Sequence, residues 1–240
     1  MPPHYKGVRG RMITPICGRT EWIASWAQLP SWKPPNHRLI VISPHPDDET
    51  LAIGGFIASR RALGIEVLLI AVTDGENAYG LDESLRVVRQ TEQNRAAAHL
   101  GIPEEGIVRL HFPDSGVEPF ERELVARIAA LVSPSTLLLA PWRNDFHPDH
   151  KVCGRAAERV AAATGIVLAS YFFWTWHTED VRTVAHLPLS RFELKAAWLA
   201  RKTAALAEHK SQLIQERKLP ILPPDLLWPA RARSEVFLLS

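Results

Sequence analysis

Short apolar segments alternate with segments of helical spacing from residue 38 onward, and this alternation restricts the fold more than any other feature. The apolar segments are 39–43, 66–72, 107–112, 136–140 and 167–174. The helical segments between them are 50–63, 83–100, 119–132 and 150–163. Strands that alternate with helices predict a mostly parallel sheet with helices on both faces. We therefore predict a Rossmann-like α/β fold in a single domain, residues 37–240.

The last part of this domain follows a different pattern. A long helix is expected over 192–216, followed by a Pro-rich wrapping loop over 219–229 and a short strand over 235–239. The basic side chains of the helix and its end are interpreted as a solvated face: Lys195, Arg201, Lys202, Lys210 and Arg217.

Residues 1–36 form an N-terminal arm that is rich in proline and contains Trp22, Trp26 and Trp32. Two interpretations are open. The tryptophans pack on the main domain, or the arm makes an oligomer contact or a lid over a site.

Composition excludes several classes of protein. A net charge of +2, with no block of like charge, does not favour a nucleic-acid partner. No apolar stretch reaches the roughly 18 residues that span a membrane, and the first residues lack the apolar core of a secretory signal. Two cysteines, Cys17 and Cys153, do not make a disulfide framework. We expect a soluble cytoplasmic protein with a small-molecule partner, and an oligomer is left open.

Two polar clusters follow apolar strands. Pro44-His45-Pro46-Asp47-Asp48-Glu49 comes after the first strand, and Asn144-Asp145-Phe146-His147-Pro148-Asp149-His150 comes after the fourth. Ligands of parallel α/β sheets bind beyond the carboxyl ends of the strands. The two clusters are therefore expected to lie at one edge of the sheet and to form one site.

The residue types in these clusters indicate a metal centre. A hydrolytic zinc ion needs three nitrogen or oxygen ligands and an open position. His45 and Asp48 are three residues apart at a strand-to-helix junction, and His150 could complete the set from the second cluster. Two histidines and one carboxylate suit Zn²⁺, with Fe²⁺ as the alternative.

The neighbouring side chains are assigned to the chemistry. Asp47 could take a proton from water, and His147 could stabilise an oxyanion or protonate a leaving group. Asp149 is expected to orient a histidine, and Glu49 to hold the first loop from behind. The structural alternative for each cluster alone is a turn or a helix cap.

The motifs at 44–49 and 147–150 resemble the two signatures of the PIG-L/LmbE-like deacetylases. The resemblance covers residues 38 to about 160 and includes Gly54-Gly55, Thr73-Asp74-Gly75-Glu76, Arg89 with Glu92, and Asp114-Ser115-Gly116. It continues weakly through Ser211-Gln212 and Glu235-Val236-Phe237. It implies a metal-dependent enzyme that removes acetyl groups from N-acetylglucosamine-type sugars, with the ligands, base and acid assigned above.

The resemblance also implies that Arg89 and Asp114 contact sugar hydroxyls. The structural alternatives are an ion pair between Arg89 and Glu92, and a turn at Asp114. The chain departs from the family in its arm and in Phe146, where some members have a tyrosine; Tyr79 or Tyr171 are the candidate replacements.

The remaining aromatic residues and histidines have structural interpretations. Trp174 and Trp176 either stack on a sugar or pack in the core, and packing is favoured. His99 and His111 are expected to be structural.

The predicted function is therefore the removal of an acetyl group from an N-acetylglucosamine-type sugar or glycoconjugate. Two rivals are a metal-dependent hydrolase of a non-sugar amide, and a sugar- or nucleotide-binding module without turnover. The absence of Gly-x-Gly-x-x-Gly after the first strand disfavours a dinucleotide-binding module.

Overall fold

A mixed sheet forms the centre of the chain. The computed structural model describes residues 5–6, 12–13, 15–214 and 220–239. Within these residues the main sheet has seven strands in the order β5-β4-β3-β6-β7-β9-β8. The strands are β3 (Arg38–Ser43), β4 (Val67–Thr73), β5 (Ile107–Phe112), β6 (Thr136–Pro141), β7 (Val167–Tyr171), β8 (Leu189–Glu193) and β9 (Ser234–Leu239).

The direction of pairing confirms the predicted α/β architecture. The strands from β5 to β7 in the sheet order pair in parallel. Strand β9 pairs antiparallel with both β7 and β8. A separate pair of short strands, β1 and β2, is antiparallel. Their bounds are β1 (Tyr5–Lys6) and β2 (Met12–Ile13).

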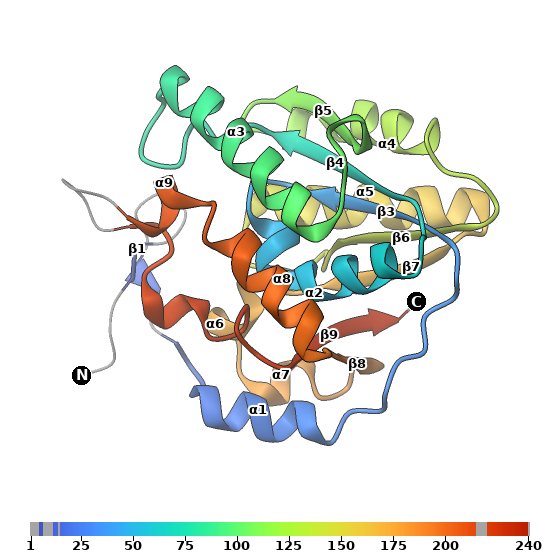
Figure 1. Cartoon of the computed structure of the whole chain (residues 1–240), viewed down its shortest axis with the longest axis vertical. Coiled ribbons are helices and arrows are strands. Elements are labelled where there is room, and N and C mark those ends of the chain that lie inside the picture. The colour runs from blue at the N-terminus through green and yellow to red at the C-terminus, as the bar shows by residue number, and fades with distance from the viewer. Residues whose placement is uncertain (1–4, 7–11, 14, 215–219, 240) are drawn as a thin grey trace.

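Helices connect the strands and cover both faces of the sheet (Figure 1). The α-helices are α1 (Arg19–Ala27), α2 (Asp48–Ala62), α3 (Glu83–Leu100), α4 (Glu121–Ala129), α5 (Pro148–Thr164), α6 (Thr175–Thr178), α7 (Val181–Val184), α8 (Ala196–Leu206) and α9 (Lys210–Leu213). The 3₁₀ turns among the described residues are η2 (Glu104–Gly106), η3 (Glu118–Phe120) and η4 (Pro224–Leu227).

The central strand β3 shows why both faces must be covered. Successive side chains of a strand point to opposite faces. Leu39 and Val41 join a buried cluster with side chains of α2, α3 and α8, whereas Ile40 and Ile42 join one with α4 and α5. All four side chains are fully buried, so the continuous apolar run of β3 is that of a strand without a solvent face.

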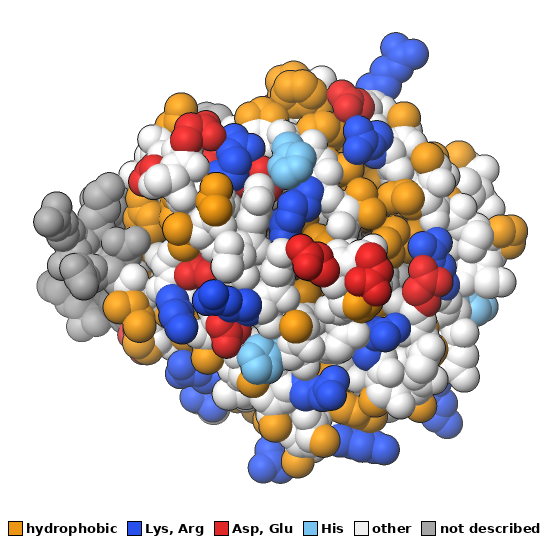
Figure 2. All heavy atoms as spheres, turned by 45° about the horizontal axis from the view of Figure 1, so that its top comes forward, with side chains coloured by type: hydrophobic (Ala, Val, Ile, Leu, Met, Phe, Trp, Pro, Cys, Tyr) orange, Lys and Arg blue, Asp and Glu red, His pale blue; other side chains and the backbone are white. Residues whose placement is uncertain are grey.

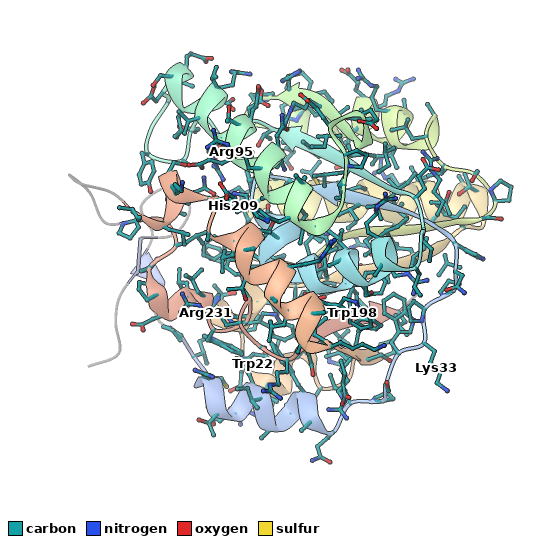
Figure 3. The ribbon with its side chains drawn as sticks, in the orientation of Figure 1. Trp22, Lys33, Arg95, Trp198, His209 and Arg231 are labelled. Carbon is teal, nitrogen blue, oxygen red and sulfur yellow. The ribbon has the colours of Figure 1, made fainter. Side chains whose placement is uncertain are left out.

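The segment predicted as one helix over 192–216 is divided in the structure, so that prediction was wrong. Phe192 belongs to β8, where it pairs with Glu235 of β9. Helix α8 ends at Leu206 and α9 begins at Lys210. Between them the buried His209 points inward, with Nε2 3.3 Å from Thr50 Oγ1 (Figure 3). The partner of His209 is 159 residues away along the chain, so helical spacing alone did not indicate the break.

Lys202 also departs from the prediction of a solvated face. Its side chain is fully buried on α8, and its Nζ lies 2.6 Å from Glu235 Oε1. The partner is 33 residues away along the chain, so nothing in the helical pattern indicated it. Arg217 lies outside the described residues.

The tryptophans of the arm pack on the domain, as the first interpretation of residues 1–36 predicts. Trp22 and Trp26 of α1 meet Trp176 edge to face, with ring centroids 4.9 and 4.8 Å apart. Trp32 stacks on Phe56 of α2 at 5.2 Å. The burial of Trp22 and Trp26 against Trp176 also means that Trp176 packs in the core and does not stack on a sugar.

On the face drawn in Figure 2, Asp and Glu side chains lie among Lys and Arg over the upper and middle parts, whereas Lys and Arg prevail along the lower edge. Among the described helices, none has an apolar stretch long enough to cross a membrane.

Candidate metal centre

The loops after β3, β5 and β6 meet at the carboxyl edge of the sheet. Because these strands are parallel, their carboxyl ends lie on the same side. The structure brings together the nine side chains predicted for the site, and each is at most 9% exposed. They are His45, Asp47, Asp48, Glu49, Arg89, Asp114, His147, Asp149 and His150.

The first loop is held from both sides. Thr73, at the end of β4, donates its backbone N–H (3.1 Å) and its hydroxyl (2.8 Å) to Pro44 O. The Ser43 hydroxyl oxygen lies within hydrogen-bond distance of Glu49 Oε2 (2.6 Å) and of His45 O (2.7 Å). Gln93 of α3 also donates to Glu49 Oε2, at 3.3 Å. Glu49 therefore has the position behind the loop that the sequence predicts.

One carboxylate oxygen lies between two imidazoles. Asp48 Oδ2 is 3.1 Å from His45 Nδ1 and 3.0 Å from His150 Nε2. His150 is fully buried, yet within the described part of the chain neither of its ring nitrogens has a hydrogen bond of good geometry. Since a buried polar atom without a partner is costly, this arrangement fits a bound cation. His147 adds a further ring nitrogen, and the three histidines offer atoms within 4.8 Å of one another.

In His45 and in His150, the ring nitrogen that does not face Asp48 lies near another carboxylate. His45 Nε2 is 3.2 Å from Asp149 Oδ2 and 3.4 Å from Asp114 Oδ1. His150 Nδ1 is 3.4 Å from Asp145 Oδ1. Histidines that bind metals commonly donate the other N–H to a carboxylate, which sets the tautomer and the ring orientation. The three histidines and the neighbouring carboxylates therefore form a group that could bind a metal ion.

Asp114 and Asp149 each accept backbone N–H groups from a loop other than their own, and together with His45 they form a second group that could hold a metal ion. Asn77 N donates to Asp114 Oδ2 at 3.0 Å. Ser115 N and Val117 N donate to the two oxygens of Asp149 at 2.8 and 3.2 Å. Asp149 contacts His45, and its role in orienting that ring stays a prediction.

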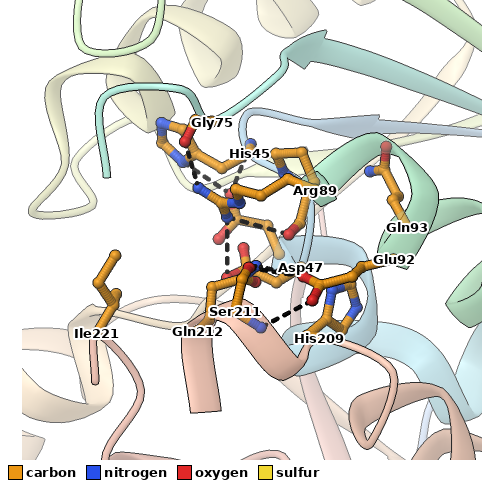
Figure 4. Close-up of polar contacts among 12 residues, drawn as sticks. His45, Asp47, Gly75, Arg89, Glu92, Gln93, His209, Ser211, Gln212 and Ile221 are labelled. Carbon is orange, nitrogen blue, oxygen red and sulfur yellow. Dashed lines mark hydrogen bonds and ion pairs between the residues drawn. The ribbon is translucent and has the colours of Figure 1, made fainter. Parts of the chain in front are cut away.

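Arg89 is directed at the first loop (Figure 4). Its guanidinium donates to Gly75 O (3.0 Å) and Pro46 O (3.1 Å), and its Nη2 is 3.3 Å from Asp47 Oδ2. Burial raises the pKa of the Asp47 carboxyl to about 8, although Arg89 acts in the opposite direction. A divalent cation next to Asp47 would favour its charged form.

The alternative ion pair between Arg89 and Glu92 is not what the structure shows. The Glu92 carboxylate accepts hydrogen bonds from Ser211 N (2.8 Å), Ser211 Oγ (2.7 Å) and Gln212 Nε2 (3.0 Å). It fixes α9 against α3, and Arg89 is free to face Asp47.

Neither tyrosine considered as a replacement for the family residue presents a hydroxyl without a partner. Tyr171 is fully buried in β7 and donates to Ile42 O at 2.7 Å. Tyr79 donates to Ser211 O at 3.0 Å and accepts from Ile221 N at 3.2 Å. Both hydroxyls therefore hold backbone segments together. His111 has the expected structural partner, with Nδ1 2.7 Å from Asp74 Oδ2.

Asp145 is a site residue that the sequence did not single out. It is 1% exposed, accepts from His147 N (3.3 Å) and Thr175 Oγ1 (3.2 Å), and faces His150. Its place in the second cluster was the available signal, but an aspartate in a loop before Pro148 is equally typical of a turn.

The chain is thus an α/β protein whose mostly parallel sheet carries, at its carboxyl edge, a buried His-Asp-His group that could hold a metal ion. Residues 40–161 match the model of the GlcNAc-PI de-N-acetylase (PIG-L) family, which covers half of the chain and both clusters. The chain belongs to this family.

Relatives agree with this assignment. A diacetylchitobiose deacetylase of Thermococcus kodakarensis is 32% identical over 49% of this chain and 46% of its own length. A 1D-myo-inositol 2-acetamido-2-deoxy-alpha-D-glucopyranoside deacetylase of Tsukamurella paurometabola is 34% identical over 72% of this chain and 73% of its own. The N,N'-diacetylchitobiose deacetylase of Pyrococcus horikoshii has the same fold, with a TM-score of 0.66 at 21% identity over 85% of this chain and 84% of the other.

Proposed function

We propose that this protein is a zinc-dependent N-deacetylase. It hydrolyses the acetamide of an N-acetylglucosamine-type sugar or conjugate to acetate and a free amine. The observation that carries the proposal is the Asp48 oxygen between His45 and His150, with neither ring nitrogen of the buried His150 in a hydrogen bond of good geometry among the described residues.

His45 Nδ1, Asp48 Oδ2 and His150 Nε2 would hold the ion. Two histidines and one carboxylate form a common zinc ligand set in hydrolases, and Fe²⁺ accepts the same ligand types. When bound there, the ion supplies Lewis-acid activation of water and of the amide carbonyl.

Asp47 is the proposed general base. It lies beside Asp48, is buried, and is oriented by the Arg89 guanidinium. Its carboxylate accepts the proton of the attacking water and can return it to the leaving nitrogen. A positioned base of this kind contributes roughly 10²–10⁴-fold to the rate.

His147 is proposed to donate a hydrogen bond to the oxygen that becomes negatively charged. Burial, together with His45 and His150 nearby, lowers the pKa of His147 well below its usual range, so the ring is neutral. Its Nδ1 accepts the N–H of Asp149 at 3.1 Å, which places the single ring proton on Nε2. The resulting Nε2–H is a fixed donor for an oxyanion.

The substrate class follows from the family and from the named relatives, whose substrates carry an acetylated glucosamine. We propose that Arg89 and Asp114 contact sugar hydroxyls in addition to holding Asp47 and His45. We also propose a cytoplasmic location, because Cys17 and Cys153 are both free thiols and a reducing compartment keeps thiols free.

The test is acetate release by zinc-loaded protein from a panel of N-acetylglucosamine glycosides, with N-acetyl-lysine as the non-sugar amide. Release from the sugars alone supports the proposal. Release from N-acetyl-lysine alone would favour the rival amide hydrolase. Metal binding without release from either would contradict the assignment as a deacetylase.

A further inference from the structure

Helix α2, whose first turn carries Asp48, is interrupted at Ile53. The backbone of Ile53 has φ −134° and ψ 19°, which is not helical. An interrupted helix leaves N–H and C=O groups without their i to i−4 partners, and buried groups of this kind need others.

One ion pair supplies partners on both sides of the interruption. Glu235 of β9 accepts the N–H of Gly55 at Oε1 (2.9 Å) and that of Phe56 at Oε2 (2.7 Å). Lys202 of α8 donates from Nζ to Glu235 Oε1 (2.6 Å) and to Ala52 O (3.4 Å). Both charged side chains are 1% exposed, so the pair is screened from solvent.

The glycines after Ile53 allow these two side chains to approach. A Cβ on Gly55 would lie 2.5 Å from Leu194 Cδ1 and 3.1 Å from Glu235 Oε1. A Cβ on Gly54 would lie 3.1 Å from Lys202 Cγ. Gly54 and Gly55 thus leave the space that Lys202 and Glu235 occupy beside α2. The proposed chemistry of the site uses neither the glycines nor Glu235.

A buried ion pair is a poor way to gain stability, because desolvation offsets much of the attraction and apolar residues often do as well. Apolar side chains could not bond two N–H groups and a carbonyl across a helix break. We propose that Lys202 and Glu235 are positioning residues that set the direction in which the first turn of α2 presents Asp48 and Asp47. This inference rests on the proposed function, since it assigns the pair a role in metal binding and turnover.

The test compares Glu235→Gln, Lys202→Met and the double variant with the wild type. The zinc dissociation constant is measured by competition with a chromogenic chelator, and kcat and KM by acetate release. Because displaced supports of a metal ligand weaken binding by roughly 10–100-fold, we expect a rise of that size in the dissociation constant. We also expect a lower kcat with little change in KM. The double variant carries no unpaired buried charge, so it serves where a single variant fails to fold.

Leu124→Ala is the control, because Leu124 is fully buried in α4 on the opposite face of the sheet. It should lose stability and keep the wild-type zinc dissociation constant. If the double variant folds and binds zinc as the wild type does, the positioning role is wrong and the pair is only structural. If the wild type binds zinc but releases no acetate, the proposed function fails while the metal data still decide this inference. A wild type that binds no zinc would overturn both.

Discussion

Replacing Asp145 with asparagine isolates the effect of one charge on the proposed metal site. Asp145 Oδ1 lies 3.4 Å from His150 Nδ1, and its carboxylate also accepts from His147 N and Thr175 Oγ1. Asparagine has nearly the same shape and keeps one oxygen as an acceptor. The substitution therefore removes the negative charge behind His150 and leaves the loop bonded.

The expected loss of zinc affinity is at the lower end of the range for carboxylates that support a ligating histidine. Removing a carboxylate behind a ligating histidine costs roughly 10–100-fold in metal affinity. Because the amide oxygen keeps an acceptor next to His150 Nδ1 and only the charge is lost, we expect about tenfold, or about 1.4 kcal/mol. The loss should appear in the zinc dissociation constant from chelator competition, with the thermal midpoint of the metal-free protein within a few degrees of the wild type.

Two further variants are the controls for this measurement. His150→Ala should abolish binding, because it removes a proposed ligand. Asp74→Asn changes a fully buried carboxylate at the same edge of the sheet that bonds Arg86 and His111, so it should leave zinc binding unaltered. An unchanged dissociation constant in Asp145→Asn, with the other two variants behaving as expected, would refute the role of Asp145.

Three further predictions follow from the described contacts. Asp47→Asn should keep zinc and lower kcat by roughly 10²–10⁴-fold; turnover at the wild-type rate would remove Asp47 from the role of base. Burial lowers the pKa of His177 and His209 to about 3, whereas an unfolded chain protonates them near 6.5, so stability should fall as the pH drops below 6.5. At pH 5 the free energy of unfolding, measured with urea, should be lower by about 2 kcal/mol for each of the two histidines. His209→Gln should reduce their combined contribution by about half. Trp22→Ala should lower the free energy of unfolding by about 3–5 kcal/mol in the same assay without changing zinc binding. A decrease below about 1 kcal/mol would mean that α1 does not pack on the domain in solution.

The elements that the sequence predicts well are those with local signals. The strand at β3 is a continuous apolar run, and α3 ends where Gly101 takes φ 88°, a conformation that favours glycine. The site was predictable for a different reason. Parallel strands place their carboxyl ends together, so His45 and His150 could be brought to one place without knowledge of the packing.

Residues whose role depends on a distant partner were beyond prediction. Phe192 has helical spacing with the residues after it, but pairing with Glu235 of β9 places it in a strand. Asp145 looks like a turn residue until His150 is found facing it. In each case the pattern along the chain describes the local preference, and the contact that overrides it comes from another element.

Lys202 shows how a contact that the sequence pattern does not indicate can matter for the proposed function. On an amphipathic helix a lysine is most simply a solvated residue, and only the interruption of α2 at Ile53 creates the carbonyl and N–H groups that the Lys202–Glu235 pair satisfies. The motif at 44–49, which contains the proposed ligands His45 and Asp48, lies more than a hundred residues from Lys202 and Glu235 along the chain, and the motif can be found without that pair. A chain with both clusters intact and a hydrophobic residue in place of Glu235 would therefore keep the signature of the family. If the pair has the role proposed for it, such a chain would bind its metal more weakly, because the first turn of α2 would no longer be fixed.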